Sequence, residues 1–174
     1  MNNKVLVIGG AGYLGSVLCD RLLSEGYSVR ILDSFIYGKR SVEKYSGNSN
    51  VEIIEGDIRN IETVHVAISD SNSVILLAAV VGDPASKARP EQTVETNFLA
   101  AQVVASSAKL AGVSKFIYAS TCSVYGVGSD ILDEEAPLNP VSLYAKTKIS
   151  SEESIMGIAD GNFKPVIMRM STLY

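Results

Sequence analysis

The chain has 174 residues, of which 47% are hydrophobic and 20% charged, and its formal net charge is −4. This profile is typical of a single globular domain that buries a core of its own. The acidic balance, without a basic patch or a block of like charge, argues against nucleic acid and anionic membranes as partners. No apolar run is long enough to span a bilayer and no signal peptide is visible, so we expect a cytoplasmic protein.

Cysteine and histidine are scarce. Cys19 and Cys122 are the only cysteines, they are distant in sequence, and they lack metal-ligand spacing. Reduced thiols in a reducing compartment are the simplest interpretation. His65 is the only histidine, so we expect no metal site, and a Ser-His-Asp triad is possible only through that residue. His65 follows a helical pattern, and we interpret it as structural or solvated.

The predicted elements alternate along the chain between short apolar strands and helices. Strands that are apolar throughout are typical of a parallel sheet covered on both faces. Strand–helix alternation indicates an α/β fold, a Rossmann-type doubly wound parallel sheet in three αβα layers, over residues 1–174. The expected strands span residues 5–8, 29–32, 51–54, 74–77, 115–119 and 165–169, and the clearest helices span 14–25, 91–111 and 143–156. A long polar loop over 125–140 is of the kind that covers a site or lies on the surface.

A glycine pattern joins the first strand to the first helix. Gly9, Gly12 and Gly15 have the spacing and the strand-to-helix context of a dinucleotide-binding fingerprint. The first glycine permits a sharp turn, the second a close approach of backbone to a pyrophosphate, and the third tight packing of helix on strand. The helix N-terminus then offers free N–H groups and a positive dipole end to the phosphates.

Asp33 ends the second strand, 18 residues after Gly15. A carboxylate there can accept both hydroxyls of an adenosine ribose and would repel the 2′-phosphate of NADP, so NAD is the expected cofactor. Arg30, Lys39 and Arg40 are near in sequence and could soften that preference.

Two further acidic residues follow strands and leave their roles open. Asp57, after the third strand, could lie beside an adenine ring or cap the helix that follows. Asp83, after the fourth strand, could contact substrate or cap the next helix.

Tyr144 and Lys148 lie four residues apart, one turn along one face of the helix predicted over 143–156. A lysine ammonium stabilises a tyrosinate, and a tyrosine with a lowered pKa is a usable general acid or base. Without other context, a solvated pair on a helix surface would be the simpler interpretation. The glycine pattern and Asp33 supply that context and favour catalysis.

These features together resemble a known family, the extended short-chain dehydrogenase/reductases, and within it the nucleotide-sugar epimerase/dehydratase group that includes the UDP-galactose 4-epimerases. The resemblance covers all 174 residues. The motifs that carry it, in chain order, are Gly9-x-x-Gly12-x-x-Gly15, Leu77-Ala78-Ala79, Ser120-Thr121-Cys122-Ser123-Val124-Tyr125-Gly126, Tyr144-x-x-x-Lys148 and Arg169-x-x-x-x-Tyr174.

The resemblance implies a role for each of several residues. Tyr144 would be the catalytic acid/base, Lys148 would bind the nicotinamide ribose and lower the Tyr144 pKa, and Thr121 would hydrogen-bond the reacting sugar oxygen. Asn97 matches a family Asn near the active site, and a buried Asn within a helix needs partners. The residues expected to contact NAD are Gly9, Gly12, Tyr13, Leu14, Gly15, Asp33, Ser34, Asp57, Ile58, Ala78, Ala79, Val80, Asn97, Tyr144 and Lys148.

The expected function is that of an NAD-dependent nucleotide-sugar epimerase, in which a hydride leaves the sugar for NAD and returns to the opposite face. Nucleotide-sugar dehydrogenases, reductases and decarboxylases share these motifs and remain alternatives, as does a non-catalytic NAD-binding fragment. Cys122 and Ser123 stand where sugar 4,6-dehydratases of the family carry an Asp-Glu pair, which argues against that activity.

Family members run to nearly twice this length, so we expect residues 1–174 to be the NAD-binding N-terminal portion of a longer enzyme, without the substrate domain. The helices over 91–111 and 143–156 resemble those that pair two family subunits, so we expect a homodimer.

Overall fold

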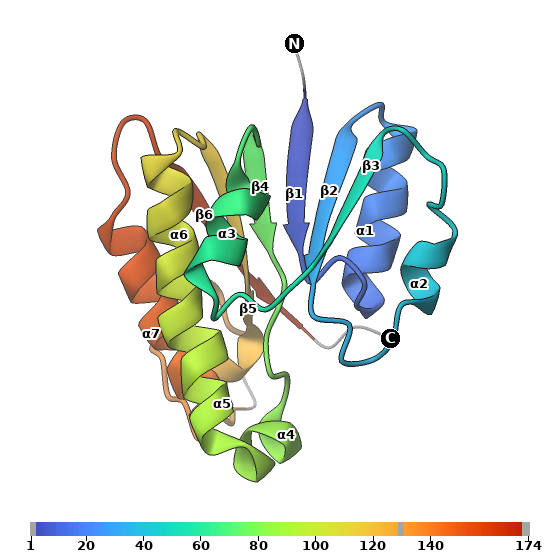
Figure 1. The fold of residues 1–174 in the computed structure, drawn as a ribbon. Coiled ribbons are helices and arrows are strands. Elements are labelled where there is room, and N and C mark those ends of the chain that lie inside the picture. The colour runs from blue at the N-terminus through green and yellow to red at the C-terminus, as the bar shows by residue number, and fades with distance from the viewer. Residues whose placement is uncertain (1–2, 129–130, 172–174) are drawn as a thin grey trace.

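The computed structural model describes residues 3–128 and 131–171 and contains a sheet of six parallel strands in the order β3-β2-β1-β4-β5-β6 (Figure 1). Every predicted strand is present within two residues of its expected bounds. The strands are β1 (Lys4–Ile8), β2 (Ser28–Asp33), β3 (Val51–Glu55), β4 (Ser73–Leu76), β5 (Lys115–Thr121) and β6 (Lys164–Met170). The doubly wound Rossmann-type fold is therefore confirmed.

Helices connect the strands. They are α1 (Tyr13–Ser24), α2 (Arg40–Glu43), α3 (Ile61–Ile68), α4 (Asp83–Ala88), α5 (Pro90–Val94), the π-helix η1 (Glu95–Ala100), α6 (Ala101–Leu110), the short 3₁₀ turn η2 (Cys122–Tyr125) and α7 (Leu143–Gly157). No helix among residues 3–128 and 131–171 has the length and apolar character needed to cross a membrane.

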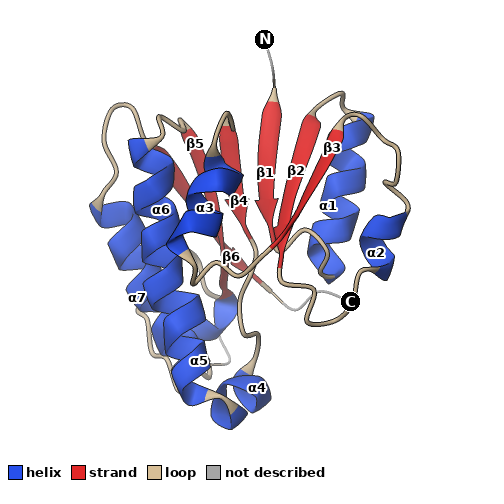
Figure 2. Cartoon of the chain, in the orientation of Figure 1, coloured by secondary structure: helices blue, strands red, loops and turns tan. Residues whose placement is uncertain are grey.

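Helices cover both faces of the sheet (Figure 2). An apolar core lies on each face, and alternate residues of each strand divide between the two cores. In β1, Leu6 and Ile8 face the larger core, which α3, α6 and α7 cover. Val5 and Val7 face the smaller core, which α1 and α2 cover. Residues 5–8 of β1 are therefore all apolar and buried, as expected for a strand covered on both faces.

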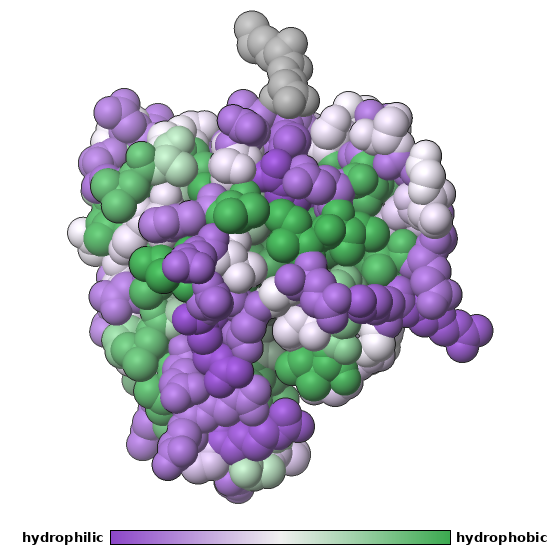
Figure 3. Space-filling model, in the orientation of Figure 1, coloured by the Kyte–Doolittle hydropathy of each residue, from purple (hydrophilic) through white to green (hydrophobic). Residues whose placement is uncertain are grey.

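The covering is incomplete at both ends of the sheet. Val166 and Met168 of β6 face away from α7 and remain 54% and 48% exposed. Figure 3 shows further apolar surface over β2 and β3 beside α3. On the opposite face of β3, Ile53 is 42% exposed and lines a pocket with Phe35 and Val42. Helices therefore cover both faces of the sheet completely only over its middle strands.

The helix predicted over 91–111 differs from a regular α-helix. It consists of α5, one wide π turn in η1, and α6. The π turn contains Asn97, whose main-chain carbonyl accepts hydrogen bonds from the hydroxyls of Ser151 (2.6 Å) and Tyr118 (3.5 Å). Such single π turns are frequent at functional sites. The spacing of apolar residues in the sequence does not reveal them.

Because all the strands are parallel, their carboxyl ends lie along one edge of the sheet, the lower edge in Figure 1. The chain reverses its direction of winding between β1 and β4, and ligands of such sheets bind in the crevice at that point.

Candidate functional site

The glycine loop lies at this crevice, between β1 and α1. Gly9 has a φ of +86° and approaches the next loop so closely that a Cβ on it would lie 2.7 Å from the amide nitrogen of Ala78. A Cβ on Gly15 would overlap the carbonyl oxygen of Gly9. Gly12 is the N-cap of α1 and no side chain caps that helix end. The N–H groups of the first turn, at Tyr13 and Leu14, are therefore available to an anion such as a pyrophosphate.

Asp33 ties the glycine loop to the end of β2. Its carboxylate accepts hydrogen bonds from the N–H groups of Ala11 (3.0 Å) and Phe35 (2.9 Å). A carboxylate has further lone pairs for ribose hydroxyls. Ser34, the next residue, is exposed.

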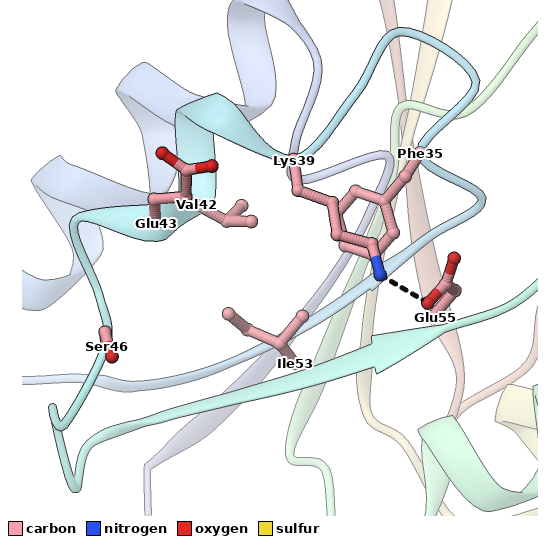
Figure 4. Close-up of a pocket in the computed structure, with 7 residues that line it drawn as sticks. All are labelled: Phe35, Lys39, Val42, Glu43, Ser46, Ile53 and Glu55. Atoms are coloured by element: carbon pink, nitrogen blue, oxygen red, sulfur yellow. Dashed lines mark hydrogen bonds and ion pairs between the residues drawn. The ribbon is translucent and has the colours of Figure 1, made fainter.

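Two of the basic residues near Asp33 in sequence form ion pairs with other carboxylates. Arg30 is buried, with its guanidinium 2.7 Å from Glu52 and also bonded to the carbonyl of Ala67 at the end of α3. Lys39 lies 2.6 Å from Glu55, across a pocket of about 560 Å³ (Figure 4). Among the described residues, none of Arg30, Lys39 and Arg40 pairs with Asp33, so the expectation that they soften the NAD preference gains no support.

Asp57 and Ile58 follow β3. Asp57 forms a fork with the guanidinium of Arg59, and this contact holds the pKa of the Asp57 carboxyl below its ordinary value. Asn60, rather than Asp57, caps α3, because its Oδ1 accepts the Thr63 N–H at 3.0 Å. The capping alternative for Asp57 is therefore wrong. The Ile58 side chain is buried in the larger core.

The loop after β4 brings Ala78, Ala79 and Val80 beside the glycine loop. Asn97, fully buried in η1, supports this loop with both ends of its amide: Oδ1 accepts the Val80 N–H at 2.7 Å and Nδ2 donates to the Val80 carbonyl at 2.9 Å. The expected partners of the buried amide are thus identified. Asp83 begins α4 with Gly82 as the N-cap and without a side-chain cap, so the capping alternative for Asp83 is also wrong.

Thr121, Tyr144 and Lys148 meet at the carboxyl end of β5. Thr121 is the last residue of β5, and its Oγ1 accepts the Ser123 N–H at 3.2 Å. Tyr144 lies in the first turn of α7, which Ser142 caps through a 3.1 Å bond from the Ala145 N–H to its Oγ. All three predicted catalytic side chains are buried.

Lys148 lies one turn beyond Tyr144 and points at β5. Its ammonium donates to the Ala119 carbonyl at 2.8 Å and lies 4.6 Å from the centre of the Tyr118 ring and 5.9 Å from the centre of the Tyr144 ring. Burial lowers the pKa of Lys148 to about 7. Tyr144 and Lys148 are therefore not a solvated surface pair.

The electrostatics of Tyr144 differ from the sequence prediction. Burial raises the pKa of its phenol, Cys122 and Asp83 add to that effect, and a hydrogen bond with Thr121 opposes it. The sequence predicts a lowered pKa for this phenol, whereas the pKa is raised in this arrangement, because desolvation of the phenolate is the largest effect on it.

Sequence reasoning missed a buried polar group behind these three residues. Glu152 of α7 accepts hydrogen bonds from the hydroxyl of Ser120 and from the guanidinium of Arg169, the latter at 2.8 Å. The available signal was the position of Glu152, one further turn along the face of Tyr144 and Lys148.

The residues present suit a dinucleotide. The backbone at Gly9 and Gly15 is packed too closely for any Cβ, the N-terminus of α1 is uncapped, and Asp33 offers carboxylate oxygens at the end of β2. Along the carboxyl edge of the sheet from the glycine loop to β5 lie in turn the loop after β4 and then Thr121 and Tyr144. Such a site can hold an elongated ligand with a buried acid/base at one end.

The sequence pattern of the NAD dependent epimerase/dehydratase family matches residues 5–174. A UDP-glucose 4-epimerase of Rhizobium leguminosarum bv. trifolii is 30% identical over 169 residues, which are 95% of this chain and 50% of that protein. A UDP-N-acetyl-alpha-D-glucosaminuronate decarboxylase of Bacillus cytotoxicus is 31% identical over 181 aligned positions, which cover 100% of this chain and 56% of that protein.

A solved structure of UDP-glucuronic acid 4-epimerase from Bacillus cereus, in complex with UDP-glucuronic acid and NAD, superposes with a TM-score of 0.88 at 31% identity. The match covers 95% of this chain and 55% of that one. The chain thus spans about half the length of the curated relatives it matches. The match over residues 5–174 shows that the chain belongs to the NAD-dependent epimerase/dehydratase family of enzymes.

Proposed function

We propose that this chain carries the NAD-binding and proton-transfer residues of a nucleotide-sugar epimerase. The observation that carries the proposal is the meeting of Thr121, Tyr144 and Lys148, all buried, at the end of β5. The UDP-sugar epimerases among the relatives support the same class of substrate. Residues 1–174 would form the NAD-binding domain, with the sugar-nucleotide pocket completed by further residues.

The cofactor contacts belong to the proposal. The backbone of Gly9, Gly12 and Gly15 and the first turn of α1 would hold the pyrophosphate, and Asp33 would accept the ribose hydroxyls. Tyr13, Leu14, Ser34, Asp57, Ile58, Ala78, Ala79, Val80 and Asn97 would border the cofactor, although the Asn97 amide acts on it through Val80 and the buried Ile58 offers mainly its backbone.

The chemistry follows from the residues at the end of β5. Tyr144 takes the proton of a sugar hydroxyl, and Thr121 orients that oxygen by a hydrogen bond. Lys148 supplies a positive charge beside the developing phenolate and a donor for a ribose hydroxyl. NAD, when bound, would supply the acceptor for the hydride of the sugar carbon and the donor for its return to the opposite face. Tyr144 then gives the proton back to the sugar oxygen.

A decarboxylase is the second candidate, because a decarboxylase acting on a UDP-linked uronic sugar is as similar to this chain as the epimerases are. In the proposed chemistry, both reactions would begin with oxidation of a sugar hydroxyl by the same residues. They separate only in what happens to the oxidised sugar.

The test uses the full protein that the gene encodes, incubated with UDP-, GDP-, CDP- and dTDP-sugars, including uronic acids, with products followed by NMR. An epimer formed without net accumulation of NADH supports the epimerase. A sugar that has lost its carboxyl carbon as CO₂ supports the decarboxylase, and stoichiometric NADH supports a dehydrogenase. NAD binding without any product would contradict catalysis and leave a non-catalytic NAD-binding module.

We further propose a homodimer formed through residues 91–111 and 143–156. Leu99 of η1 and Met156 of α7 are apolar yet 48% and 49% exposed, which suits a face that a second copy covers. Both cysteines are free thiols, in keeping with the proposed location in the reducing cytoplasm.

A further inference from the structure

Glu152 is a buried carboxylate that the proposed reaction does not use. Its side chain is 7% exposed, and it lies four residues after Lys148 and eight after Tyr144 on the same face of α7. Carboxylates are rarely buried unless their oxygens are bound by donors or cations. A residue of this kind, one turn from the proposed catalytic lysine, needs a physical explanation.

The donors to Glu152 come from two neighbouring strands. One carboxylate oxygen accepts the hydroxyl of Ser120, the residue directly before Thr121 in β5. The other accepts Nε (3.0 Å) and Nη2 (2.8 Å) of Arg169, which pairs with Ser120 in the β5–β6 register. Glu152 therefore fixes α7 to the strand end that carries Thr121.

Arg169 extends the contact to the next loop. Its Nη1 donates to the Tyr125 hydroxyl at 3.0 Å and to the Glu134 carbonyl at 3.1 Å. One guanidinium thus joins α7, the turn after Thr121 and the long loop over 125–140. The Glu152 carboxylate is the only anionic group that anchors it among the described residues.

Lys148 has few charges near it. Within the described part of the chain, no carboxylate lies within 4.0 Å of its ammonium, whose hydrogen bond goes to the Ala119 carbonyl. The aromatic rings of Tyr118 in β5 and Tyr144 in α7 flank it, while Cys122 and Asp83 act on Tyr144 from η2 and α4. Glu152 is the group whose negative charge favours the protonated form of Lys148.

We propose that Glu152 is a positioning residue of the active site, whose carboxylate holds the Thr121 strand end against α7 and stabilises the buried ammonium of Lys148. The inference rests on the proposed roles of Thr121 and Lys148. The effect of Glu152 on Lys148 is electrostatic and can be measured without substrate or cofactor. The role of Glu152 can therefore be disproved while the proposed function still holds.

The experiment is a pH titration of ¹³C-lysine-labelled protein by NMR, with the Lys148 Cε signal assigned from its loss in Lys148→Arg. Glu152→Gln removes the charge and keeps the shape, and we expect the pKa of Lys148 to fall by about one pH unit or more. Glu152→Asp, which keeps the charge, should restore most of the difference. Glu153→Gln is the matched control, because Glu153 is the adjacent carboxylate on the exposed face of α7 and its loss should leave the titration unchanged.

Folding is checked by thermal unfolding of each variant. Glu152→Gln could unfold because Arg169 is left without its partner. In that case the Lys148 titration is compared between Arg169→Gln and the double variant Glu152→Gln/Arg169→Gln. The pKa of Lys148 should be lower in the double variant by the same amount. An unchanged Lys148 titration in folded Glu152→Gln, or an equal change in Glu153→Gln, would overturn the proposal.

Discussion

Gly15 has no room for even one added methyl group. A Cβ there would overlap the carbonyl of Gly9 and crowd the backbone of Gly10, so helix α1 could no longer pack as it does on the end of β1. The position thus couples the packing of a helix to the shape of the proposed phosphate site.

Gly15→Ala is therefore expected to destabilise the protein by about 1–3 kcal/mol, the usual cost of overpacking, and to weaken NAD binding. Gly157→Ala is the control, since a Cβ on this last residue of α7 meets nothing within 4 Å and alanine favours a helix over glycine by ~1 kcal/mol. Urea unfolding and calorimetric NAD binding measure both effects. Equal stability of the two variants would contradict the steric account.

Lys148 makes stability depend on pH. Burial lowers its pKa to about 7 in the folded chain, whereas an unfolded lysine titrates near ~10.4. Between these values the unfolded state binds more protons, so the contribution of Lys148 to stability rises as pH rises. Below pH about 7 both states are protonated and the contribution is constant at its least favourable value.

We therefore compare the free energies of unfolding of the wild type and of Lys148→Met. From the two pKa values, the difference (wild type minus variant) should increase between about pH 7 and pH 9 and stay constant between about pH 5 and pH 6. Denaturant titrations at each pH measure it. Parallel pH curves for the two proteins would contradict the burial of an ionisable Lys148.

At the scale of elements, helix α7 carries Tyr144 in its first turn, so the start of the helix sets where the phenol lies. Ser142→Ala removes the cap on the Ala145 N–H and should cost about 1 kcal/mol of stability. Ser142→Asp retains an acceptor and should recover most of it. Thermal unfolding distinguishes the two, and equal loss in both variants would argue against capping as the cause.

The strands and α7 were predictable because their signals are local. A short apolar run ended by glycines marks β1, and a helical pattern over 143–156 marks α7. The π turn around Asn97 was not predictable, because it satisfies bonds to Val80 and Ser151 that come from elsewhere in the chain. Sequence spacing shows which residues share a face of a helix, but it does not show which residues from distant parts of the chain form hydrogen bonds with them.

The positions of several candidate site residues were also predictable from local sequence signals, but their contacts with distant residues were not. Gly9, Asp33 and Tyr144 follow known offsets from strands and helices, and they lie where expected. The buried contact between Glu152 and Arg169 joins α7 to β6, and the raised pKa of Tyr144 depends on desolvation. Both effects arise only after packing.

At the scale of the whole molecule, the proposed dimer face includes Leu99 of η1 and Met156 of α7, both about half exposed. We expect Leu99→Glu and Met156→Glu to shift a dimer to monomer, because a carboxylate buried in an apolar interface is strongly unfavourable. Val66→Glu on α3 is the control, since Val66 is also apolar and 61% exposed but lies outside the proposed face. Sedimentation velocity measures the outcome, and a dimer retained in all three variants would contradict this face.

The central claim is that Tyr144 transfers the proton of the substrate hydroxyl, and Tyr144→Phe in the full protein tests it most directly. The variant should lose turnover of the nucleotide sugar by at least about a hundredfold while its affinity for NAD stays nearly that of the wild type. Tyr27→Phe, a half-buried tyrosine at the opposite end of the sheet, should leave both unchanged. Turnover in Tyr144→Phe equal to that of the wild type would contradict the assignment.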